Sequence, residues 1–101
     1  MNAVHVRIDV TGTAVLTISG DIDRTIADRI HTAMQELLTV HHPTTVRVDV
    51  GHVTYLSQAG AATIVAWRAA AAAAGTAVGF RNATDHIVRQ AAAYGYRELF
   101  E

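Results

Sequence analysis

Cysteine and lysine are both missing from the 101 residues of this chain, and each absence excludes a class of chemistry. Without cysteine there is no disulfide scaffold, thiolate metal site or cysteine nucleophile. Without lysine there is no Schiff-base chemistry and no lysine-dependent phosphate loop. The eight basic residues are all arginines scattered along the chain, and the net charge is -1. This balance argues against a nucleic-acid-binding protein, which usually carries a basic patch.

Long apolar runs are also missing. No window approaches the ~20 apolar residues of a membrane span, and residues 1–5 have neither the positive charge nor the apolar stretch of a signal peptide. Half of the residues are nevertheless hydrophobic, which is enough for one self-sufficient core at this length. We therefore expect a single domain over residues 1–101, cytoplasmic and not inserted in a membrane.

Apolar residues alternate with polar ones at the start of the chain and again after Pro43. The alternation predicts strands over residues 4–10, 13–19 and 46–50, the first two joined as a hairpin through Thr11 and Gly12. Apolar residues at helical spacing then predict a helix over residues 26–38, with Asp23 or Thr25 as its N-cap. Thr25 and Asp28 have the spacing of a capping box. Pro43 is expected to close that helix.

The second half of the chain alternates between strand and helix. A helix is predicted from about Ser57 through the alanine run at 69–74, with Gly75 as its left-handed stop. A short strand at 76–80 and a last helix capped by Thr84 or Asp85 complete the order β-β-α-β-α-β-α. The sequence thus predicts an α/β domain with a mixed four-stranded sheet, because strands joined by helical crossovers run parallel.

The segment VRVDVGHVTYLSQAG at residues 46–60 resembles the signature of the STAS family, the bacterial anti-sigma factor antagonists. In that family a buried strand leads into a D-S-S-G-L turn at the start of the second helix. The turn at 20–23, which is similar to the family's G-E-I-D, and the end of the chain near Gly95 extend the resemblance over nearly the whole sequence. The resemblance implies a STAS fold and binding to an anti-sigma factor of the serine kinase type, controlled by phosphorylation of the second serine.

The switch motif departs from the family pattern. The family aspartate falls on Ser57, the first serine on Gln58, the phosphoacceptor serine on Ala59 and the glycine on Gly60. Since alanine has no hydroxyl, we expect no phosphorylation at the usual position. The resemblance places partner binding at Asp21, Asp23, Ser57, Gln58, Ala59 and Gly60.

Two of these residues have a structural alternative. Ser57 can be a replacement phosphoacceptor, or it can simply cap the helix, since Ser and Asp are comparable N-caps. Asp23 can face the partner, or it can cap the first helix. The capping role is the one we expect for Ser57.

Metal, cofactor and catalytic sites are not predicted. The six histidines lack the spacing of metal ligands and are expected on the solvated surface. Asp21 and Asp23 at a strand-to-helix turn are more often caps than a general acid and base. We therefore expect a non-enzymatic protein-interaction module without a cofactor. The alternative is a STAS accessory subunit of an ABC-type membrane transporter, which docks on an ATPase without any kinase.

Overall fold

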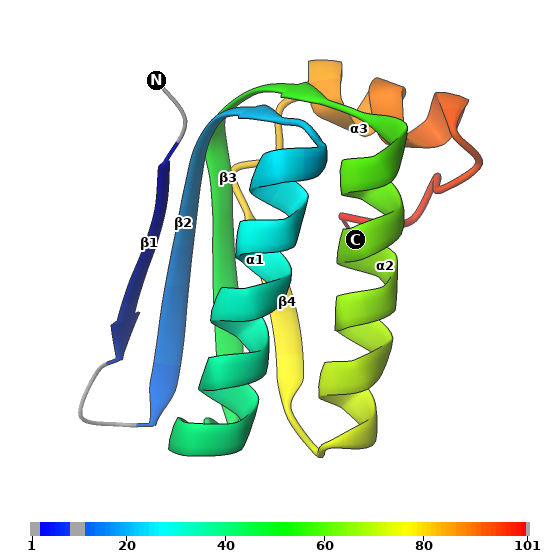
Figure 1. Ribbon diagram of the computed structural model, residues 1–101. Coiled ribbons are helices and arrows are strands. Elements are labelled where there is room, and N and C mark those ends of the chain that lie inside the picture. Colours follow the sequence, from blue (N-terminus) through cyan, green and yellow to red (C-terminus); the bar gives the residue numbers. More distant parts are fainter. Residues whose placement is uncertain (1–2, 9–11, 101) are drawn as a thin grey trace.

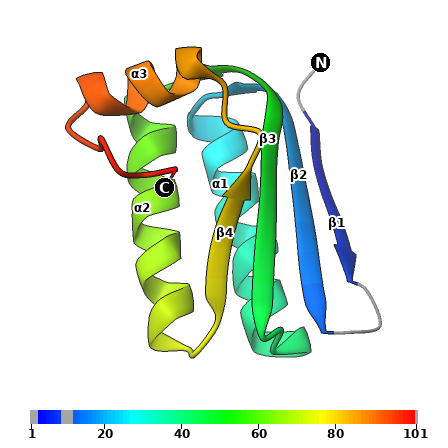
Figure 2. The same cartoon turned by 180° about the vertical axis from the view of Figure 1, so that it is seen from behind.

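The computed structural model describes residues 3–8 and 12–100, which form one sheet with helices on one of its faces. The sheet has four strands in the order β1-β2-β3-β4. Strand β1 is antiparallel to β2, while β3 lies parallel to both β2 and β4. Figures 1 and 2 show α1 and α2 side by side on one face, the opposite face without a helix, and α3 across one end. The predicted α/β class and mixed four-stranded sheet are confirmed.

The elements follow the predicted order. Their bounds are β1 Ala3–Ile8, β2 Thr13–Ile22, α1 Arg24–Glu36, a π-helical turn η1 Leu37–His41, β3 Thr45–Leu56, α2 Gln58–Ala73, β4 Ala77–Arg81 and α3 Asp85–Ala93.

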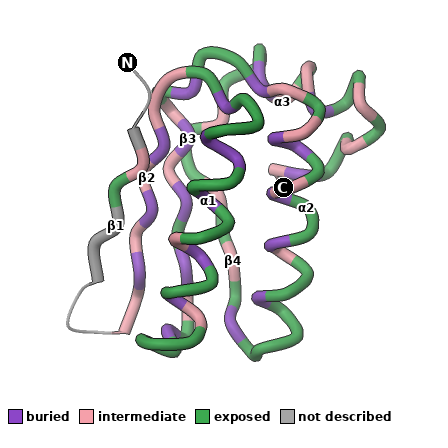
Figure 3. Tube along the Cα trace, viewed as in Figure 1, coloured by how far each residue is buried: buried purple, intermediate pink, exposed green. Residues whose placement is uncertain are grey.

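The core lies between the sheet and the two long helices. Alternate side chains of β2 and β3 are completely buried, namely Ala14, Leu16, Ile18, Val46, Val48 and Val50. The helices contribute Ile30, Met34, Ile64 and Trp67 from the faces that meet the sheet. Figure 3 shows the resulting alternation along β2 and β3, in which buried residues are separated by residues of intermediate or full exposure. Because the period is two, the intervening side chains of the strands lie on the face without helices.

Several boundaries differ from the prediction. Strand β2 continues past Gly20, at φ +84°, to Ile22, and two register irregularities against β3 accommodate the extension. Strand β3 likewise runs to Leu56. The part of the predicted hairpin at residues 9–11 lies outside the described residues.

The structure decides between the alternative caps of α1 and shows how the two long helices end. Asp23 caps α1, so the capping box of Thr25 and Asp28 is wrong: the helix already begins at Arg24, before Thr25 could act as its cap. Helix α1 continues directly into the π-helical turn η1. That turn ends at His42, which has φ +46° and directly precedes Pro43. Gly75 has φ +82°, which confirms the predicted left-handed stop after α2.

Candidate functional site

The first turn of α2 begins directly at the end of β3. Ser57 is the N-cap: its Oγ accepts a hydrogen bond of 2.9 Å from the backbone N–H of Gly60, and its carbonyl accepts one of 2.9 Å from Ala61. Its own N–H donates to the carbonyl of Ile22, at 2.9 Å. The predicted capping role of Ser57 is therefore confirmed.

The same turn packs closely on the end of β2. A Cβ atom added at Gly60 would lie 2.6 Å from Cγ2 of Ile22 and 2.8 Å from its carbonyl oxygen. Real Cβ atoms do not approach other heavy atoms this closely, so any residue larger than glycine would force Ile22, β2 or α2 to shift. Gly60 thus allows the start of α2 to lie against the strand that leads into α1.

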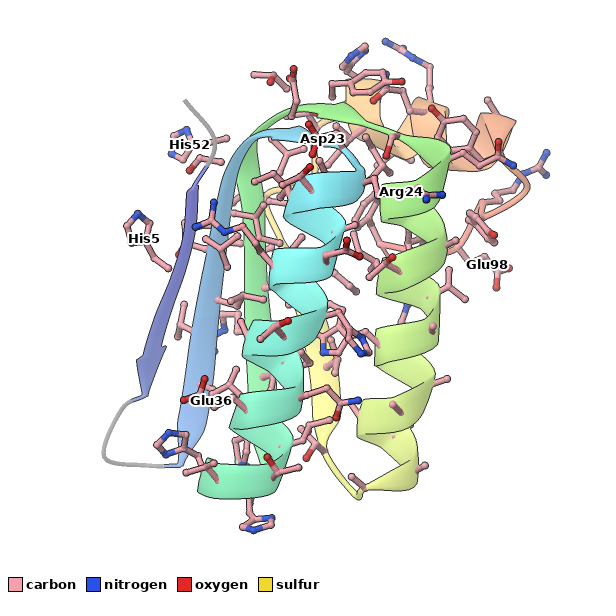
Figure 4. All side chains as sticks on the ribbon, in the orientation of Figure 1. His5, Asp23, Arg24, Glu36, His52 and Glu98 are labelled. Atoms are coloured by element: carbon pink, nitrogen blue, oxygen red, sulfur yellow. The ribbon has the colours of Figure 1, made fainter. Side chains whose placement is uncertain are left out.

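The turn between β2 and α1 brings two carboxylates to this end of the sheet. Oδ1 of Asp23 accepts a hydrogen bond of 3.0 Å from the N–H of Ile26 and caps α1. Oδ1 of Asp21 accepts one of 2.7 Å from the hydroxyl of Thr54 on β3. Figure 4 shows Asp23 at the start of α1, at the end of the sheet where α2 also begins.

The residues predicted to bind a partner are brought together, but they are not equally accessible. Asp21, Asp23 and Gln58 are exposed, Ser57 and Ala59 are half-buried, and Gly60 is buried. We call the accessible five residues, Asp21, Asp23, Ser57, Gln58 and Ala59, the helix-start face. Gly60 lies beneath this face and shapes it through its contact with Ile22.

Helix α3 supports the end of β3 beside the helix-start face, which the sequence reasoning did not predict. The N–H of Leu56 donates to Oε1 of Gln90 at 2.8 Å, and the hydroxyl of Tyr94 donates to the carbonyl of Leu56 at 2.9 Å. Desolvation raises the pKa of Tyr94, and a hydrogen bond and charge interaction with Tyr55 raise that pKa further. No local signal in the sequence could have paired residues so far apart along the chain.

Tyr55 lies two residues before Ser57 of the helix-start face, and its large side chain is 43% exposed. In the parallel pairing of β2 and β3 its register partner is Asp21. Aromatic residues are enriched in protein interfaces. The accessible surface at this end of the sheet therefore combines two carboxylates with an aromatic ring.

Neither a metal cluster nor a membrane helix is found among the described residues. All six histidines are exposed, as predicted, and Figure 4 shows His5 beside β1, away from the helices. No group of three metal-ligating side chains lies together within residues 3–8 and 12–100. No helix in the same part of the chain has the length and apolar character needed to cross a membrane.

Solved structures of low sequence identity share this fold. SpoIIAA from Bacillus in its phosphorylated form has a TM-score of 0.76 at 12% identity, over 98% of this chain and 89% of that one. An anti-sigma factor antagonist from Mycobacterium paratuberculosis has a TM-score of 0.72 at 22% identity, over 99% and 83%. A sulfate transporter family protein from Wolinella succinogenes has a TM-score of 0.74 at 16% identity, over 94% and 75%. No curated protein matches the sequence significantly.

A family model gives the assignment that these structural similarities leave open. The model described as "Mlab, STAS domain" matches residues 5–101, which is almost the whole chain. The matched residues include most of β1 and every later strand and helix of the fold. The chain belongs to the STAS domain family.

Proposed function

We propose that this domain is a non-enzymatic interaction module that binds an anti-sigma factor of the serine kinase type through the helix-start face, and so regulates transcription in the cytoplasm. The observation that carries the proposal is the junction of the two helix starts. Ser57 and Gly60 join the first turn of α2 to Ile22, next to the cap of α1. The accessible residues of both helix starts therefore lie at one end of the sheet, where the STAS signature has its switch. The similarity to anti-sigma factor antagonists supports this reading.

Binding in this protein is constitutive under the proposal. Ala59, at the family's phosphoacceptor position, has only a methyl group, so no phosphate can be added there. Ser57 is two residues earlier, and its oxygen already accepts the Gly60 N–H at 2.9 Å. A kinase would have to remove this cap in order to use Ser57, which favours the structural role.

A second candidate function is an accessory subunit of a membrane transporter complex, with an ATPase as the partner. The similarity to the sulfate transporter family protein favours this candidate. A partner that does not phosphorylate the domain is also compatible with alanine at position 59. Both candidates use the domain as a docking module, so the identity of the partner distinguishes them.

The experiment is affinity capture from the native host with the tagged wild-type domain, followed by mass spectrometry. The matched baits are Ala59→Glu and Ala69→Glu. Both residues are on α2, but Ala69 is exposed and lies about 15 Å farther along the helix axis. A glutamate in the first turn is compatible with the helix dipole, so Ala59→Glu is expected to fold and to lose its partner through charge and size.

The proposal predicts that wild type and Ala69→Glu capture a serine-kinase-type anti-sigma factor, and that Ala59→Glu does not. An ATPase with its permease captured in the same pattern would support the transporter reading instead. Capture of the same partner by all three baits would contradict the helix-start face.

A further inference from the structure

The sheet face without helices has a hollow of about 400 Å³, lined by Val15, Arg47, Asp49, Arg81 and Asn82. Both arginines are exposed, whereas Val46 and Val48 on either side of Arg47 are fully buried in the core. The alternation therefore places Arg47 on the open face. The hollow is separate from the helix-start face, because none of its lining residues belongs to that face.

The strand register brings the two guanidinium groups within reach of one ligand. Arg47 of β3 is paired with Gly79 of β4, and Arg81 is two residues farther along β4. Diagonal neighbours in a sheet are about 7–8 Å apart, which long side chains can span. A Cβ at Gly79 would meet no atom within 4 Å. The space beside Arg47 is therefore open.

The nearby carboxylate is held in other hydrogen bonds. Oδ1 of Asp49 accepts from the backbone N–H of Gly51 at 2.9 Å and from Nδ2 of Asn82 at 3.3 Å. Among the side chains that the structure describes, neither Arg47 nor Arg81 has a hydrogen bond or ion pair. With Asp49 included, the hollow has a net charge of +1, and its unused donors are the N–H groups of two guanidiniums.

We propose that this hollow binds the phosphate group of a phosphomonoester, with the organic part of the ligand against Val15. Guanidinium groups form bidentate, charge-assisted hydrogen bonds with phosphate, and two of them can divide its oxygens between them. The phosphate carries about -1.5 to -2 charges at neutral pH, which is opposite in sign to the net charge of +1 in the hollow. Val15 is half-buried and offers the apolar contact. The phosphomonoester can be a free small molecule or a lipid headgroup.

Titration calorimetry with phenyl phosphate and with inorganic phosphate tests the proposal. Phenyl phosphate should bind more tightly, because its ring can contact Val15. Arg47→Gln and Arg81→Gln should each weaken binding of phenyl phosphate about tenfold or more, since each removes a charged hydrogen-bond donor. Arg24→Gln and Arg89→Gln remove the same charge from exposed positions on α1 and α3 and should leave binding unchanged. All four variants should melt at the wild-type temperature.

Flotation with vesicles distinguishes the two sources of the phosphate. Binding to phosphatidic acid in phosphatidylcholine, but not to phosphatidylcholine alone, would identify a lipid headgroup if Arg47→Gln and Arg81→Gln abolish it. Binding of phenyl phosphate alone would identify a small molecule. If no probe binds, or if binding is equally weakened in all four arginine variants, the proposed site does not exist.

Discussion

Replacing Gly60 with alanine tests the close packing on which the helix-start face depends. The added Cβ would lie 2.6 Å from Cγ2 of Ile22 and 2.8 Å from its carbonyl oxygen. The side-chain contact could be relieved by a rotation, but the contact with the backbone oxygen requires α2 or β2 to move. Overpacking of this kind costs about 1–3 kcal/mol.

A smaller term opposes this cost. Alanine is a better helix former than glycine by up to about 1 kcal/mol in a helix interior. Gly60 is in the first turn of α2, where this gain is smaller. The net expectation is a loss of about 1–2 kcal/mol in the free energy of unfolding, from the two terms together. The melting temperature should fall by about 4–8 °C for each kcal/mol lost.

Gly79→Ala is the matched control for this experiment. The same Cβ added at Gly79 meets nothing within 4 Å. Glycine weakens a strand interior, so this variant should be as stable as wild type or slightly more stable. Urea unfolding of the two variants and wild type gives the comparison. If Gly60→Ala were as stable as Gly79→Ala, the close contact between α2 and Ile22 would be refuted.

Three further predictions concern the cap, the switch and alkaline pH. Ser57→Ala removes the cap of α2 and should lower the free energy of unfolding by about 1 kcal/mol, whereas Ser57→Asp should be at least as stable as wild type and bind the partner normally. Thermal unfolding and a binding titration on the same preparation check both variants. Failure of Ser57→Asp to bind would make Ser57 the switch. Intact-mass measurement after incubation with the captured kinase and ATP should show no added phosphate, whereas stoichiometric modification would contradict constitutive binding. Because folding raises the pKa of Tyr94, the contribution of this residue to the free energy of unfolding should be fully present below the ordinary phenol pKa of about 10 and should fall as the pH rises above it. Tyr94→Phe should reduce this pH dependence in urea titrations between pH 8 and 11. An unchanged dependence of stability on pH would exclude Tyr94 as its source.

Local pattern predicted the elements of this fold well, because each has a strong period or a clear stop signal. The alternation around Val48 marked β3, and the alanine run with Gly75 marked α2 and its end. The prediction failed where pairing between distant residues decides the outcome. Strand β2 passes Gly20 and reaches Ile22 because β3 offers it a partner there, through two irregularities that no local pattern shows.

The candidate site was predictable in part for the same reason. Ser57 and Asp23 were recognisable as caps because a cap acts within three residues of itself. The support of Leu56 by Gln90 and Tyr94 was not recognisable, since the bonds span more than thirty residues. The need for glycine at position 60 became clear only when Ile22 was seen beside it.

Hydrogen exchange on the domain, alone and in complex with its captured partner, tests the central claim most directly. If the helix-start face binds the partner, amide protection should increase at residues 21–24 and 57–62 and stay unchanged on β4 and in the second half of α2. Increased protection on β4 or along the second half of α2, without any at 57–62, would contradict the account.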